Sequence, residues 1–488
     1  MLTGFQRISI AAAVALALSA CTTVGSDFSA PKNIDGVAYR HQGAAAPAQA
    51  SLPQQWWTVF GDTGLNQLEE GALRDNPSVR AAAQRLIQAE AQLRTARADE
   101  RPSLSVNANV ANSRTSANTS QGLALGGRAI SGNQFGVGAA LSYEVDLLGR
   151  VRRLVEAADA ETLVAQADRD GVLLMLSTQV ASSYWQLRGL DVEMTILNGA
   201  LATRGETLEL VQARFTAGLT NELDLARAKV ERSNAQADLH EVRRQRNLLE
   251  HSLAVLTGRS PSSALLPAAA DAGALPEPPA IPVGLPASLL AQRPDLAGSV
   301  AGLRAANAEV GVAEGAFYPT LQLTGNFGFA SERLRDLAKG GSRQFSAGPL
   351  SLSLPIFDGG RNRANLDAAK ARYDEALANH EGKLLTALRE VEDALSDLEQ
   401  RQLQGQAQAQ SQEAAARAYL VARARYERGI SNYLDVTDAQ RSSLTADRAA
   451  AQITTQRLLA TVAVARALGA GWQGSPALAA VAGANPVR

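Results

Sequence analysis

Several common features are scarce or missing in this chain of 488 residues. Its only cysteine is Cys21, so no intrachain disulfide bond can form. Beyond residue 20 there is no run of about eighteen apolar residues, so we expect no membrane-spanning helix there. The 47 Lys and Arg residues against 48 Asp and Glu residues leave no basic excess, which argues against a nucleic acid partner. Aromatic residues make up only 5% of the chain, a composition that favours long helices over a thick globular core.

Motifs for catalysis and metal binding are also missing. The four histidines, His41, His240, His251 and His380, do not have the spacing of metal ligands. The chain contains no phosphate-binding loop, no dinucleotide-binding fingerprint and no nucleophile elbow. We therefore expect neither an enzyme nor a protein that needs a metal or an organic cofactor.

Proline is absent from two long stretches, residues 103–260 and 356–475. Because proline interrupts helices, both stretches can hold very long ones, and a helix over residues 150–214 would measure about 97 Å. The first stretch has a heptad pattern of apolar residues, which predicts a coiled coil, and the second has a weaker one. In the first stretch these residues are Leu173, Leu176, Val180, Leu187, Leu190, Met194, Leu197, Leu201, Leu208, Val211 and Phe215.

The chain also repeats itself. Pro77 in an Asn-Pro-Ser-Val segment matches Pro294 in Arg-Pro-Asp-Leu at an offset of 217 residues. The pattern Ala-Arg-aromatic-x-x-Gly-x-x-Asn-x-Leu-Asp begins at Ala213 and again at Ala424, an offset of 211 residues. One register held over so many positions indicates a tandem duplication.

These features divide the chain into six segments. They are a lipoprotein signal peptide (1–20), a lipid-anchored tether (21–60), a first repeat with a helix, two strands and a long helical hairpin (61–260), a Pro-rich connector (261–286), a second repeat (287–472) and a disordered tail (473–488).

The N-terminus predicts a lipid anchor. Arg7 precedes an apolar run that ends in Leu18-Ser19-Ala20-Cys21, which resembles the bacterial lipobox. In such lipoproteins the cysteine is acylated and becomes the mature N-terminus, and the buried acyl chains hold the protein to the membrane. The alternative is an ordinary secretory signal in which the cysteine is coincidental.

Each repeat contains two regions in which apolar residues alternate with small or polar ones. Strands of about ten residues with one apolar face are typical of outer-membrane barrels, although half-buried strands of a soluble sheet would alternate in the same way. Four strands cannot close a barrel, so several chains would have to share one. The apolar positions are Leu104, Val106, Ala108, Val110; Phe135, Val137, Ala139, Leu141, Tyr143, Val145; Leu321, Leu323, Gly325, Phe327, Phe329; and Leu350, Leu352, Leu354.

The chain resembles the outer membrane factors, export ducts of the TolC and OprM type, and most closely their NodT-like lipoprotein branch. The resemblance extends over nearly all of the mature chain. The matching segments, in chain order, are Leu18-Ser19-Ala20-Cys21, Trp57-Thr58-Val59-Phe60-Gly61-Asp62, Asn76-Pro77, Ser142-Tyr143-Glu144-Val145-Asp146-Leu147-Leu148-Gly149-Arg150, Gln292-Arg293-Pro294-Asp295-Leu296, Leu354-Pro355-Ile356-Phe357-Asp358-Gly359-Gly360 and Tyr433-Leu434-Asp435-Val436-Thr437-Asp438-Ala439-Gln440-Arg441.

The resemblance implies a mixed α and β fold. A long α-helical coiled-coil barrel would stand in the periplasm, and each chain of a homotrimer would give four strands to one transmembrane β-barrel in the outer membrane. The expected partners are a periplasmic membrane-fusion adaptor, an inner-membrane pump of the resistance-nodulation-division (RND) class, and outer-membrane lipid. The expected function is export of drugs or other small molecules across the outer membrane, as the channel of a tripartite efflux system, without a cofactor other than the covalent lipid on Cys21.

The repeated pattern is expected at the far end of the long helices, where its glycines would allow a turn between antiparallel helices. The resemblance implies that these turns dock the adaptor, and the alternative is that they only join helices. The side chains of Arg214, Leu219, Arg425 and Ile430 would then be exposed at the tips. The docking residues would be Arg214, Gly218, Leu219, Arg425, Gly429 and Ile430.

Three residues just beyond the second turn, Leu434, Asp435 and Asp438, are candidates for an aperture gate. In OprM-like ducts the residues that match Leu434 and Asp438 ring the closed aperture, where three carboxylates would attract cations. Alternatively, the two aspartates only stabilise the N-terminus of a helix. Arg425 and Arg441 are candidate partners for the carboxylates.

Two other functions are compatible with the sequence. The duct could belong to a type I protein secretion system or a polysaccharide secretion system. Alternatively, the chain could be a lipid-anchored structural coiled-coil scaffold without a pore, but such a scaffold has no use for barrel strands.

Overall fold

The computed structural model describes residues 23–31, 39–41, 52–124, 126–263, 274–281 and 293–472. The expected signal peptide, Cys21 and the tail after residue 472 lie outside these ranges. The chain forms two compact units, each with segments from both repeats. The sheet unit comprises Met1–Ala30, Leu86–Val164 and Ser299–His380, and the hairpin unit comprises Pro31–Arg85, Ala165–Gly298 and Glu381–Arg488.

The same series of elements occurs twice along the chain, which confirms the tandem repeat. α5 and α9 have 67 residues each, α6 and α10 have 35 each, and α3 and α8 have 22 each. The first series is α3 (Pro77–Ala98), β1 (Ser103–Arg114), β2 (Ser131–Val145), α5 (Arg150–Thr216) and α6 (Glu222–Leu256). The second is α8 (Pro294–Gly315), β3 (Thr320–Ser331), β4 (Arg343–Ser353), α9 (Arg361–Glu427) and α10 (Tyr433–Ala467).

Short elements complete the fold. η1 (Trp56–Phe60) and α2 (Thr63–Asp75) precede the first series, α4 (Ser120–Ala124) connects β1 to β2, and η2 (Leu334–Asp336) and η3 (Gly340–Ser342) connect β3 to β4. Within the described ranges, no helix is both long and apolar enough to cross a membrane.

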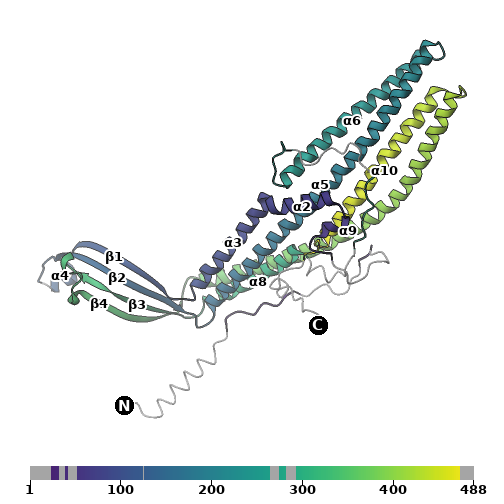
Figure 1. Cartoon of the computed structure of the whole chain (residues 1–488). Coiled ribbons are helices and arrows are strands. Elements are labelled where there is room, and N and C mark those ends of the chain that lie inside the picture. Colours follow the sequence, from purple (N-terminus) through teal and green to yellow (C-terminus); the bar gives the residue numbers. More distant parts are fainter. Residues whose placement is uncertain are drawn as a thin grey trace. The chain divides into compact units, whose positions relative to one another are not determined.

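The four strands form one antiparallel sheet in the order β1-β2-β3-β4 (Figure 1). The register pairs Val106 with Ala139, and Ala139 in turn with Phe327, which pairs with Phe345. Because residues directly opposite each other in an antiparallel pair point to the same side, the alternating apolar residues of all four strands share one face.

That apolar face is uncovered in the chain. The exposed fraction is 73% for Val106, 77% for Val110 and 81% for Phe345. The opposite face consists mostly of Ser, Asn, Gln, Thr and Gly residues. β1 and β4 are the edge strands, so each has one row of backbone groups that the other three strands do not pair.

The hairpin unit contains a core of apolar side chains from η1, α2, α5 and α10. Trp56, Trp185 and Leu65 are almost completely buried, and the Trp56 ring packs edge-on against Phe60. The indole nitrogen of Trp56 donates a hydrogen bond to the Ser177 hydroxyl at 3.1 Å, which satisfies its polar group inside the core. These contacts fix the chain before α2 against the middle of α5.

The Arg293-Pro294-Asp295 segment quoted for the resemblance has a structural role at the start of α8. The buried Arg293 guanidinium binds both oxygens of Asp295, the Glu390 carboxylate on α9 and the carbonyl of Ala467 at the end of α10. One side chain therefore joins three helices of the hairpin unit.

Candidate functional site

The two helical hairpins, α5–α6 and α9–α10, turn at the same end of the hairpin unit (Figure 1). Gly218 (φ +69°) and Gly429 (φ +74°) occupy the left-handed conformation in the two turns, which favours glycine. Asn221 then caps α6 and Asn432 caps α10, each by accepting a hydrogen bond from the backbone N–H three residues later. The same glycine and asparagine therefore build the turn twice.

Each turn carries one prominent apolar side chain. Leu219 is 76% exposed and Ile430 is 61% exposed. Their backbone N–H groups donate to the carbonyls of Arg214 and Arg425, which satisfies one carbonyl at each helix end. The turns therefore hold these side chains in the same orientation with respect to their own hairpins.

Arg214 differs from the expectation of an exposed docking residue. It is half-buried, and its guanidinium lies over the Tyr426 ring, 4.5 Å from the centroid. It also donates hydrogen bonds to the carbonyls of Tyr426 (3.3 Å) and Glu427 (3.2 Å), the last two residues of α9. A cation at a helix C-terminus is favourable, so Arg214 fastens the first hairpin to the second.

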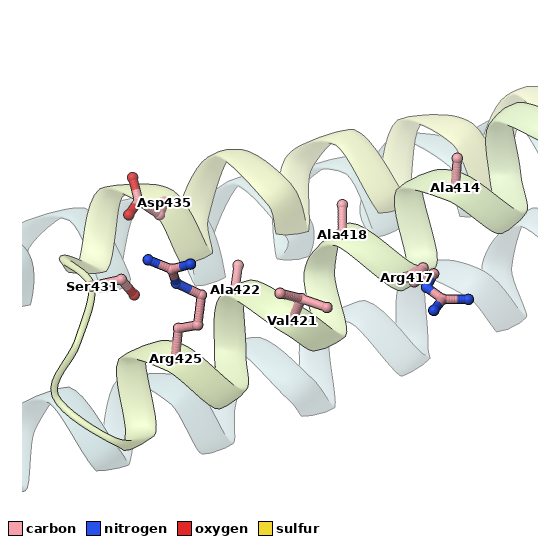
Figure 2. Close-up of a pocket in the computed structure, with 8 residues that line it drawn as sticks. All are labelled: Ala414, Arg417, Ala418, Val421, Ala422, Arg425, Ser431 and Asp435. Atoms are coloured by element: carbon pink, nitrogen blue, oxygen red, sulfur yellow. The ribbon is translucent and has the colours of Figure 1, made fainter.

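Arg425, the repeat equivalent of Arg214, is exposed as expected. It lines an open groove of about 500 Å³ between α9 and α10, together with Ala418, Val421, Ala422 and Asp435. Figure 2 shows the Arg425 side chain extending from α9 toward the start of α10, where Asp435 lies.

The three gate candidates lie within the first two turns of α10. The cap is Asn432, whose side chain accepts a hydrogen bond from the Asp435 N–H at 3.0 Å. Asp435 itself lies in the first turn of α10, where the helix dipole favours a negative charge. Asp438 is not the cap: its side chain is 62% exposed, and its carboxylate lies 4.0 Å from the Arg441 guanidinium. Leu434 is also exposed.

The structure adds a buried charge cluster just beyond the turns, which we call the Glu231 cluster: Glu231 of α6, Arg204 of α5 and Arg441 of α10. The Glu231 side chain is only 4% exposed and that of Arg204 only 6%. Arg204 Nη2 lies 3.1 Å from the Glu231 carboxylate as an ion pair, and Arg204 Nη1 donates a hydrogen bond to the Glu231 backbone carbonyl at 2.8 Å. The carboxylate also accepts from Arg441 Nε at 2.7 Å, with a further contact to Arg441 Nη2. Burial lowers the pKa of Arg204, which the Glu231 carboxylate opposes, and the hydrogen bond to Glu231 raises the pKa of Arg441.

A second ionic contact lies further along the same helices. Arg448 of α10 binds Glu193 of α5 at 2.6 Å and Asp238 of α6 at 3.3 Å. Sequence reasoning did not find either cluster, because the partners from the two hairpins lie 210 to 255 residues apart along the chain. The one signal available was that Arg204 interrupts the apolar heptad pattern.

No group of three or more His, Cys, Asp or Glu side chains in the described part of the chain could hold a metal ion. His380 is buried and shares a hydrogen bond with Ser299.

Comparison with known proteins identifies the family. The sequence model of the family described as "Outer membrane efflux protein" matches residues 68–259 and 285–470, so its two matched segments fall on the two repeats. The chain belongs to this family. The family expectation from the sequence is thereby confirmed.

Individual relatives match along almost their entire length. Outer membrane protein OprJ of Pseudomonas aeruginosa is 35% identical over 463 residues, which cover 94% of this chain and 95% of OprJ. Antibiotic efflux pump outer membrane protein ArpC of Pseudomonas putida is 32% identical over 94% of this chain and 95% of ArpC. The solved structure of the outer-membrane channel OprN matches with a TM-score of 0.84 and 32% identity, covering 92% of this chain and all of that one.

The Glu231 cluster gives a first prediction. Glu231→Ala should lower the free energy of unfolding by about 3–5 kcal/mol, because Arg204 would remain buried without a counter-charge. Arg441→Ala should cost only about 1 kcal/mol, because Glu231 keeps Arg204 as its partner and Arg441 is half-exposed. Thermal unfolding followed by far-ultraviolet circular dichroism measures both.

The matched control is Arg244→Ala, which breaks an exposed ion pair with Glu241 on the same helix as Glu231. It should leave the unfolding transition unchanged. If Glu231→Ala shifts the transition no more than this control does, the cluster does not stabilise the hairpins.

Proposed function

We propose that the protein is the outer-membrane channel of a tripartite efflux system, which receives drugs or other small molecules from an inner-membrane RND-type pump and releases them outside the cell. The observation that carries the proposal is the four-stranded sheet, with one uncovered apolar face, one polar face and two unpaired edges. Family membership supports the same function.

The sheet fits a shared barrel. Its apolar face would meet lipid and its polar face would line the lumen, as in outer-membrane barrels. In hydrocarbon the free backbone groups of β1 and β4 have no water to bind, so β4 of one chain would have to pair with β1 of another. We propose that three chains close the barrel in this way, since three is the number that the family resemblance implies.

The relatives favour drug efflux over the other two functions. ArpC is named as the outer membrane protein of an antibiotic efflux pump, which supports a small-molecule cargo rather than a secreted protein or polysaccharide. A coiled-coil scaffold would leave the one-sided apolar sheet without a role. We propose that the duct binds no cofactor and catalyses no reaction, and that transport energy comes from the pump.

We propose that the turns dock the periplasmic adaptor. Leu219 and Ile430 offer exposed apolar contacts, and Gly218 and Gly429 allow another backbone to approach closely. Among the six expected docking residues, Arg214 would act indirectly. Its guanidinium is bound to the end of α9, so it would hold the second hairpin in place and not contact the adaptor itself.

Lipidation at Cys21 is supported by the segment that follows it. Arg153, in the first turn of α5, donates hydrogen bonds to the carbonyls of Val24 and Gly25 and pairs with Asp27. Val24 N–H also donates to the Leu148 carbonyl, just beyond the end of β2. The described segment that follows Cys21 in the sequence is therefore held beside the end of β2, which suits an anchor in the same membrane as the strands.

The function predicts a trimeric pore. Purified full-length protein should give native mass spectra of a trimer in detergent and discrete single-channel conductance in a planar bilayer. Because the sheet cannot close alone, the two results should appear together. A stable monomer with no conductance would rule out the duct.

The lipid anchor predicts that Cys21→Ser abolishes incorporation of radiolabelled palmitate, because no other thiol is present. Thr22→Ser, which keeps the cysteine, is the control and should incorporate label normally. Label that persists in Cys21→Ser would refute lipidation at this residue. The barrel should still form in the variant, because its own apolar face suffices for insertion.

The gate predicts that Asp438→Ala raises the resting conductance and lowers cation selectivity in planar bilayers, because it removes a ring of carboxylates from the aperture. Leu434→Ala should add to the leak by widening the apolar constriction. Recordings at low and high salt distinguish the charge effect, which salt screens, from the steric one.

The control for the gate is Asn432→Ala, which removes the cap of α10 at a cost of about 1 kcal/mol but keeps Leu434, Asp435 and Asp438. If this variant leaks as much as Asp438→Ala, loosening of the turn explains the result and Asp438 has no gating role. Unchanged conductance in Asp438→Ala and Leu434→Ala would likewise remove the assignment.

A further inference from the structure

Arg214 and Arg425 are repeat equivalents in different surroundings. Arg214 is half-buried, with its guanidinium on the carbonyls of Tyr426 and Glu427, whereas Arg425 lies exposed at the edge of an open groove. The two turns have the same glycine, the same asparagine cap and the same hydrogen-bonding pattern, so the difference does not come from the local backbone. It arises because only the first arginine has a neighbouring hairpin within the chain.

The aromatic residues at the ends of α9 and α5, which such arginines can contact, also differ in exposure. Tyr426, over which Arg214 lies, is 6% exposed. Its repeat equivalent Phe215 is 37% exposed at the end of α5, and the next residue, Thr216, is also exposed. The chain therefore presents an unused arginine on its second hairpin and an unused aromatic helix end on its first.

The groove beside Arg425 is the repeat equivalent of a surface that is covered in the first repeat. In the first repeat, Val211 is completely buried in a cluster that includes Tyr426 from the second hairpin. The equivalent of Val211 is Ala422, which lines the open groove. The surface that the second hairpin covers in the first repeat is thus left uncovered in the second repeat (Figure 2).

We propose that this groove receives the end of α5 from a second copy of the chain. Arg425 would donate hydrogen bonds to the carbonyls of Phe215 and Thr216 of that copy and lie over its Phe215 ring, as Arg214 does with Glu427 and Tyr426 within one chain. The interface is heterologous, and repeating such a contact closes a ring when the rotation fits. The proposal rests on the assembly proposed above and assigns Arg425 to contact between chains rather than to the adaptor.

Paired cysteines test this contact. In full-length protein carrying Arg425→Cys and Thr216→Cys, a short bis-maleimide should link chains and give covalent trimers on denaturing gels. The matched control, Arg214→Cys with Glu427→Cys, occupies the equivalent positions within one chain and should react without forming oligomers. Protein with Cys21 alone and the single variant Arg425→Cys should not give trimers.

The outcomes separate this contact from the duct itself. Suppose that native mass spectrometry shows a trimer and the control pair reacts, but Arg425→Cys with Thr216→Cys stays monomeric on the gel. The proposed contact is then wrong, and the proposed function as a duct is unaffected. Absence of any trimer would overturn both. If Arg425→Cys is modified freely by maleimide in the purified trimer and is protected only after an adaptor is added, the groove binds the adaptor and the contact between chains is overturned.

Discussion

The four-stranded sheet with two unpaired edges is the constraint on which the rest of the molecule depends. An apolar face of this size is unfavourable in water, and a free edge is unfavourable in hydrocarbon, so neither environment suits a single chain. Only closure by further copies satisfies both. Because each strand pair is followed by a long helical hairpin, a closed ring of strands requires a matching arrangement of helices.

The duplication makes such a ring possible with few kinds of contact. α5 and α9 have the same length, as do α6 and α10, so two hairpins of equal length lie in each chain. The contact of Arg214 with the end of α9 joins the first hairpin to the second. In the proposed assembly, the equivalent surfaces of the other repeat would make the same contact between chains. One type of contact can then join hairpins both within a chain and between chains.

Local patterns in the sequence predicted much of the fold, because local physics determines those parts. Proline-free stretches gave the long helices, alternation gave the four strands, and the glycine and asparagine of the repeated pattern appear as turn and cap. The Glu231 cluster could not be predicted, since its partners come from three helices with no fixed spacing. Arg214 was expected to be exposed for the same reason: its position in a turn pattern is local, whereas its partner on α9 is 212 residues away.

The two repeats have both kept the arginine of the turn, but only the contact within the chain has the ionic groups. At the repeat offset, Glu231 corresponds to Ser442 and Arg441 to Val230, while Glu193 corresponds to Gln404 and Arg448 to Ala237. In the assembly proposed above, the contact between hairpins of one chain therefore holds ion pairs in which the Glu231 and Glu193 carboxylates are buried, and the equivalent contact between chains holds neutral residues. Separating the hairpins of one chain removes an arginine from each of these buried carboxylates, whereas separating neutral residues has no electrostatic cost. The two hairpins of one chain should consequently stay together when the turns move, and the contacts between chains should separate first. This difference suits a duct that opens at the turns. The contacts that would separate on opening lie between chains, whereas the ion pairs that hold the two hairpins of each chain together would remain.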